Sequence, residues 1–198
     1  AYQVGEGGSS AEKPTRAELF QMVFGNLPEE PTEPESSIHW TLENGVLTLT
    51  GSGPMDEYQN QTAPWESQKD AIRSIHIGEG ITTVSSGAFS GCQNLQAVQL
   101  PETLTGLGED AFMGCYSLES IAIPGSVSKI GRRAFFNCND LYQVEIAEGV
   151  ECIGAYAFSG CKNLGKIKLP ESITQIDAWA FFRCGMLTEI ELPKALEI

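Results

Sequence analysis

The chain has 198 residues, 41% of them hydrophobic, and its 12 Lys and Arg against 26 Asp and Glu give a formal net charge of -14. This length fits one domain, or two small ones, with a substantial core. The charge disfavours nucleic acid and anionic membrane as partners, because phosphate binding needs a concentrated Lys and Arg surface. No run of about 18 apolar residues is present, so we expect no membrane insertion, and no secretory start remains at Ala1.

Residues 1–37 divide into a Gly- and Ser-rich start, a short helix and an acidic linker. Thr15 is a candidate N-cap, with Glu18 at the capping-box position. The segment 14–20 weakly resembles the last helix of surface-layer homology modules, but one helix cannot anchor a protein, so a packing helix is favoured. Residues 28–37 carry three prolines and four glutamates, which predicts an extended, solvated linker.

Residues 38–71 predict an amino-terminal β-hairpin cap. Apolar residues alternate on both sides of Asn44-Gly45, which is the strongest short signal for a tight hairpin turn. The open end of a solenoid has to be covered. Trp40, Tyr58 and Trp65 lie in this segment and are suited to that role.

Residues 72–198 form a repeat array of about five and a half units with a 23-residue period. A fixed period of roughly 20 to 29 residues with a leucine-led strand is typical of a solenoid, whose coils stack on their neighbours. Each unit has Ala-Phe, then Cys three residues after the Phe, then Leu three residues after the Cys. The copies begin at Ala88, Ala111, Ala134, Ala157 and Ala180.

We therefore predict an α/β solenoid with a parallel strand face, short helical turns at the Ala-Phe segments, and the β-hairpin as its cap. A second apolar pair in each unit brings the chain back toward the core. Gly108, Gly131 and Gly154 follow this pair, which suggests a turn with positive φ. The expected strands are centred on Ile75-x-Ile77, Val98-x-Leu100, Ile121-x-Ile123, Val144-x-Ile146, Ile167-x-Leu169 and Ile190-x-Leu192.

Five of the six cysteines occur once per unit, so stacking places them in a buried ladder. Coils about 4.8 Å apart hold such thiols beyond disulfide reach and in a line that cannot supply tetrahedral zinc ligands. We predict reduced, core-packed thiols and no metal. Cys152 lies outside the ladder and is expected near the surface.

The unit Leu-x-x-Ile-x-Ile-Pro-x-x-Val-x-x-Ile-Gly-x-x-Ala-Phe-x-x-Cys, from Leu118 to Cys138, is similar to the BspA-like (bacterial surface-antigen type) leucine-rich repeats. The cap phrase from Trp40 to Met55 resembles the segment that often precedes them, and the likeness covers about residues 38–198. It implies a secreted or cell-surface bacterial protein, whose signal peptide has been removed from this chain. The family is linked to adhesion and to binding of host or microbial surface proteins, and it has no shared catalytic residue.

The first candidate binding surface is the outward side of the strand row, because binding residues of a solenoid vary where packing residues repeat. Two interpretations stay open: a protein-binding face, or a solvated face whose charges pair across neighbouring strands. The protein-binding interpretation predicts that reversing the charges of Lys166 and Lys168 weakens binding. The candidate residues are His76, Gln99, Gln143, Glu145, Lys166, Lys168, Glu189 and Glu191.

The second candidate surface is the turn before each Ala-Phe, where Tyr156 and Trp179 occupy equivalent positions in neighbouring units. Adjacent exposed aromatics can anchor a partner or stack on a sugar ring, so a glycan is a possible ligand. They can equally shield the edge of the coils.

Catalysis has little support in the sequence. His39 and His76 have no nucleophile motif beside them, and no paired-His metal spacing is present. We expect no cofactor and a non-catalytic interaction module. The alternatives are a glycan-binding module and a structural spacer that displays another domain.

Overall fold

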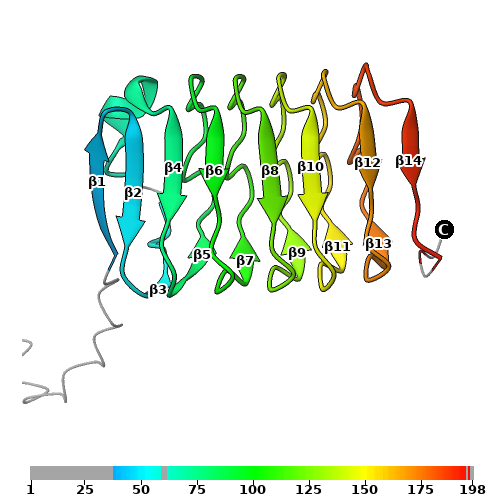
Figure 1. The fold of residues 1–198 in the computed structure, drawn as a ribbon, viewed down its shortest axis with the longest axis horizontal. Helices are drawn as coiled ribbons and strands as arrows, with labels where there is room; N and C mark the ends of the chain where they lie inside the picture. The colour runs from blue at the N-terminus through cyan, green and yellow to red at the C-terminus, as the bar shows by residue number, and fades with distance from the viewer. Residues whose placement is uncertain (1–37, 59–61, 195, 197–198) are drawn as a thin grey trace, which may run out of the picture. The chain divides into compact units, whose positions relative to one another are not determined.

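The computed structural model describes residues 38–58, 62–194 and 196 and shows a β-solenoid of about five coils (Figure 1). The helix and the linker predicted within residues 1–37 lie outside the described residues. Two rows of strands run along the stack, and the inward side chains of both rows fill the core between them.

The predicted hairpin is present at the amino-terminal end of the described chain. Strands β1 (His39–Glu43) and β2 (Val46–Thr50) pair antiparallel. Asn44 and Gly45 form the turn between them with φ values of 51° and 82°. Strand β2 also pairs in parallel with β4 (Ser74–Ile77), so the hairpin continues directly into the first strand row.

All six strands of the first row lie where the repeat predicts them, but they do not form one ladder. One sheet has the order β1-β2-β4-β6-β8-β10, while β12 and β14 form a separate two-stranded sheet. After β4, the strands of the row are β6 (Ala97–Gln99), β8 (Ser120–Ile123), β10 (Gln143–Ile146), β12 (Lys166–Lys168) and β14 (Glu189–Glu191).

A second row of strands was not predicted. It forms a six-stranded sheet with the order β13-β11-β9-β7-β5-β3. The apolar pairs that bring the chain back to the core lie in or beside these strands, most of which are two residues long, too short for an alternating pattern. The strands are β3 (Gly53–Pro54), β5 (Ile81–Val84), β7 (Gly106–Leu107), β9 (Lys129–Ile130), β11 (Cys152–Ile153) and β13 (Gln175–Ile176).

No helix is assigned at the Ala-Phe segments of the described coils, so the helical turns predicted there are not confirmed. Residues in left-handed conformation bracket each Phe; in the third unit these are Arg133 at φ 53° and Asn137 at φ 60°. The Phe135 N–H donates to the Ala157 carbonyl of the next coil at 2.8 Å, not to a carbonyl four residues back. Across the described residues the one assigned helix is the 3-10 helix η1 (Glu66–Ala71), so the helical part of the α/β prediction is not seen there.

The repeated phenylalanines form one stacked column through the core. Their ring centroids lie 5.2 to 5.6 Å apart, from Phe89 to Phe181, with interplanar angles of 22° or less. Trp65 of the cap extends the column, 5.3 Å from Phe89, and its indole N–H donates to the Ala88 carbonyl at 2.8 Å. Trp40 and Tyr58 pack edge-on against Trp65, at 6.1 and 5.9 Å. The predicted aromatic cover of the first coil is therefore confirmed.

The prediction of positive φ at the turn of the repeated glycines was wrong. Gly108, Gly131 and Gly154 do not have positive φ; the left-handed residue comes two positions later in each coil. A Cβ at Gly131 would lie 2.4 Å from the Gly108 carbonyl oxygen, and one at Gly154 would lie 2.7 Å from the Ile130 carbonyl oxygen. Glycine is needed here because the backbones of neighbouring coils touch.

The cysteines pack as predicted, with all six as free thiols and four of the five ladder members fully buried. The Cys138 thiol donates to the Phe112 carbonyl of the preceding coil at 3.2 Å. Burial raises the pKa of Cys92 to about 12 and that of Cys184 to about 11. Cys152 is partly exposed; burial also raises its pKa, and the charge of Lys129 opposes that rise.

Replacing Phe135 by Ala is expected to lower the free energy of unfolding by about 3 to 5 kcal/mol, because it leaves a cavity in the middle of the column. Chemical denaturation of the two proteins measures the difference. The Tyr142→Ala variant is the control, since Tyr142 is 54% exposed. Equal losses in the two variants would contradict a packed column.

Gly131→Ala is expected to cost more than about 1 kcal/mol, because the new methyl group meets backbone that cannot move aside. Gly165→Ala is the matched control: the nearest atom to its added Cβ is 3.8 Å away. Thermal unfolding followed by circular dichroism compares the two. A Gly131→Ala protein as stable as Gly165→Ala would refute the close approach of the coils.

Cys152 is expected to react first with iodoacetamide at neutral to mildly alkaline pH. The thiolate is the nucleophile, and a raised pKa lowers the thiolate fraction at any given pH, so the buried ladder thiols should stay unmodified until the protein unfolds. Peptide mass spectrometry after timed labelling of native protein identifies the order. Early labelling of Cys115 or Cys138 would show that solvent and reagent reach the buried thiols in the folded protein.

Candidate binding surfaces

The strand face is the outward side of the first strand row, and the structure exposes its predicted residues there. In β8, β10 and β12 the outward side chains are exposed or partly so, while the alternating positions point into the core. Gln99 bonds to His76 on the adjacent strand, with 2.8 Å between the side-chain oxygen and His76 Nδ1. The sheet thus places His76, Gln99, Gln143 and Glu145 along one surface.

Some of the charged residues of the strand face pair with one another. Lys166 and Glu189 are directly opposite on β12 and β14, with 2.7 Å between the ammonium nitrogen and a carboxylate oxygen. Glu189 raises the pKa of Lys166 through a hydrogen bond and its charge. Lys168 lies opposite Glu191 in the same register. Lys166 is therefore paired with a residue of the face itself. For this residue the structure agrees with the second interpretation, in which charges pair across neighbouring strands.

Two shallow hollows lie where the strands of this face end, and the sequence did not reveal them. One, of about 320 Å³, is lined by residues of the β6, β8 and β10 coils, among them Leu100, Glu102 and Ala122. The other, of about 260 Å³, lies between the β10 and β12 coils, where the sheet is interrupted, and includes Lys168 and Leu169. Glu145 and Ile146 line both hollows, so the two adjoin.

The turn before each Ala-Phe forms a ridge of residues in left-handed conformation. Asp110, Arg133, Tyr156 and Trp179 have φ between 53° and 64°, a conformation that costs most residues about 1 kcal/mol or more. Arg133 donates to an Asp110 carboxylate oxygen at 2.6 Å, which pairs the two charged members. No feature of the sequence pattern predicted this backbone state.

The predicted neighbours Tyr156 and Trp179 are indeed adjacent. Their rings stack with centroids 6.4 Å apart at 12°, and Phe182 packs edge-on against Trp179 at 5.0 Å. Trp179 is 57% exposed. Because the rings stack on each other, one face of each is covered, and a sugar ring binds to an exposed face.

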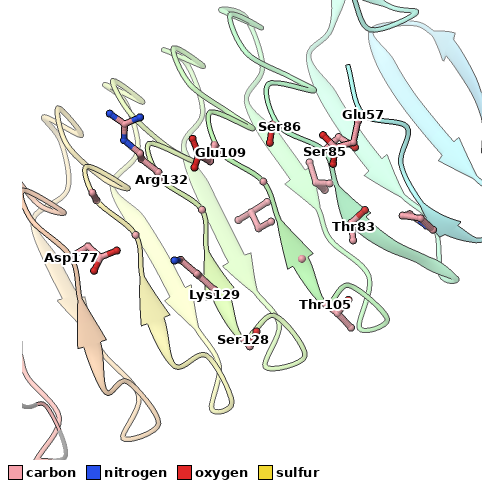
Figure 2. A pocket seen from close by; sticks show the side chains of 18 residues that line it. Glu57, Thr83, Ser85, Ser86, Thr105, Glu109, Ser128, Lys129, Arg132 and Asp177 are labelled. Carbon is pink, nitrogen blue, oxygen red and sulfur yellow. The ribbon is translucent and has the colours of Figure 1, made fainter. Parts of the chain in front are cut away.

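A long groove crosses the outer side of the second strand row (Figure 2), with a volume of about 680 Å³. Its labelled side chains come from successive coils, among them Thr83, Thr105, Lys129 and Asp177. Gly108, Gly131 and Gly154 line it because the coils approach closely there. The groove is thus a consequence of tight stacking, and its mixed charges select no particular ligand.

The described part of the chain shows no candidate metal site. No group of three His, Cys, Asp or Glu residues within it could hold a metal ion. Helices of that part are likewise too short and polar to cross a membrane.

The comparisons with known proteins agree with this architecture. The BspA type leucine-rich repeat region matches residues 67–188 in six copies. None of the curated protein sequences matches the chain.

Solved structures of bacterial proteins share the fold. The leucine-rich repeat protein TpLRR of T. pallidum is 24% identical with a TM-score of 0.62, and the match covers 81% of this chain and 82% of that one. The pneumococcal vaccine antigen PcpA is 19% identical with a TM-score of 0.59, covering 81% of this chain and 49% of that one. A leucine-rich cell surface protein of Faecalibacterium prausnitzii is 20% identical with a TM-score of 0.53, covering 79% and 53%.

This chain therefore spans about half the length of the last two structures. At these identities the likeness shows the fold alone. The family match extends over more than half of the 198 residues. The chain belongs to the BspA-type leucine-rich repeat family.

Proposed function

We propose that this chain is a non-catalytic interaction module of a secreted or surface-displayed bacterial protein, and that it binds host or microbial surface proteins through the strand face. The observation that carries this proposal is the contrast between the two sides of the first strand row. In β8, β10 and β12 the inward residues are apolar and largely buried, whereas the outward residues differ between neighbouring coils and are accessible.

Family membership and the names of the structural neighbours support the location. One neighbour is described as a cell surface protein and another as a vaccine antigen. An adhesive role follows from an exposed, variable and polar surface on a rigid stack, because such a surface can be specific without rearranging on binding.

The glycan alternative has less support. Stacking between Tyr156 and Trp179 covers one face of each ring, so the two do not offer a pair of open faces to a sugar. Glycan binding by the ridge stays a prediction.

A face-blocked variant with Ala97→Trp and Ser120→Trp tests the proposal. Both positions lie on the outward side of the strand face, and both lie outside the two hollows. Surface plasmon resonance against a panel of purified host-matrix and bacterial surface proteins should show a partner for the unmodified chain. The variant should bind that partner at least about tenfold more weakly, because a blocked contact surface raises the dissociation rate.

The control is Thr105→Trp with Gln175→Trp, which adds the same bulk on the second strand row and should bind normally. Circular dichroism should show that both variants fold. Equal binding by the face-blocked and control variants would reject the strand face. Absence of any partner for the unmodified chain would favour the spacer role.

A further inference from the structure

We propose that the two adjoining hollows form a groove for an extended, basic polypeptide segment of the partner. This inference rests on the proposed protein-binding function and names the chemistry of what is bound. The groove runs across the carboxyl ends of the strands, from the β6 coil to the β12 coil.

Apolar residues from four successive coils line the floor of the groove: Leu100, Ile123, Ile146 and Leu169. Leu100 and Ile146 are only partly buried, so their apolar surface is accessible, whereas Ile123 and Leu169 are almost fully buried. Three steps of about 4.8 Å between coils give a length of roughly 14 Å, which accommodates about four residues of extended chain.

The walls of the groove carry an excess of negative charge. Three carboxylates, those of Glu102, Glu145 and Glu148, line the groove together with one ammonium group, that of Lys168. Uncharged donors hold two of these carboxylates in place. The Gln143 amide donates to Glu145 at 2.8 Å, and the backbone N–H groups of Glu171 and Ser172 donate to Glu148 at 3.0 and 3.1 Å.

Neutral donors orient a carboxylate without cancelling its charge, so the groove still attracts cations. The net charge of -14 on the whole chain adds a long-range attraction in the same direction. Lys166, the other nearby cation, is already paired with Glu189.

An apolar floor between carboxylate walls matches the side chains of Arg and Lys. Their aliphatic stems lie along apolar surface while their charged ends reach polar groups at its margin. A small cation would not use the floor, and an acidic or purely apolar segment would not use the walls. A segment that alternates basic and aliphatic residues uses both.

The experiment uses a fluorescein-labelled hexapeptide of alternating arginine and leucine, with glutamate–leucine and glutamine–leucine hexapeptides as comparisons. Fluorescence anisotropy at physiological salt measures their binding to the whole chain. The arginine peptide should bind at least about tenfold more tightly than either comparison, because only it completes the charge pairs.

Two variants locate the site. Ala122→Trp should weaken binding of the arginine peptide by about tenfold, because the indole fills the first hollow. Glu145→Gln should weaken it by about threefold to tenfold, since it removes a charge shared by both hollows.

Matched controls separate the groove from the general acidity of the chain. Glu151→Gln makes the same change in net charge at an exposed residue that does not line the groove, and Ala178→Trp adds the same bulk at an exposed turn. Both should bind as the unmodified chain does. Equal weakening by Glu145→Gln and Glu151→Gln, equal binding of the three peptides, or no binding of the arginine peptide would each overturn the inference.

The two proposals fail in different ways. A chain whose protein partner is lost on blocking the strand face, but which does not prefer the arginine peptide, keeps its proposed function and loses the groove. A chain that binds the arginine peptide in the groove, yet keeps its protein partner when the strand face is blocked, has a basic-peptide site that its partner does not use.

Discussion

The stacking of one coil on the next is the interaction on which the rest of the structure depends. Hydrogen bonds between coils run along the second strand row, along the first row on either side of the break between β10 and β12, and through the turns that carry the Ala-Phe segments. The column of aromatic rings fills the space these backbones enclose. Because these bonds recur from coil to coil, the coils cannot slide or rotate without losing several of them together.

That rigidity decides where a ligand can be recognised. The inner residues are constrained by packing between coils. Gly108, Gly131 and Gly154 are constrained by the close contact between the backbones of neighbouring coils. Only side chains on the outside of the coils are free to differ. The interruption between β10 and β12 lies within this outer surface, and the hollow beside it brings together Glu145 from one sheet and Lys168 from the other.

Much of the fold follows from the sequence because the 23-residue period repeats the same burial pattern. Phe135 and Cys138 are buried in the structure for the reason that makes them recur, and Asn44-Gly45 turns where the pattern predicts. The second sheet was missed because strands such as Lys129–Ile130 are too short to show alternation.

Backbone torsions were harder still to predict. The helical turn expected at Ala134-Phe135 is not confirmed. The Ala134 N–H donates to the Gly131 carbonyl three residues back, but the Phe135 N–H donates to the Ala157 carbonyl of the next coil, a contact that the order of apolar residues does not encode. Of the candidate site, the exposed strand residues and the Tyr156–Trp179 contact were predictable from the period. The hollows were not, since they depend on how deeply Ile146 and Leu169 sit beside an interrupted sheet.

The left-handed ridge has a consequence for how such a protein can change over time. Its backbone state is imposed by the coils on either side, since Asp110, Arg133, Tyr156 and Trp179 all adopt it despite their different side chains. A mutation there alters the surface while the core stays intact. Duplication of a coil would copy the scaffold and leave this position open to diverge, so the array can evolve new surface chemistry one repeat at a time.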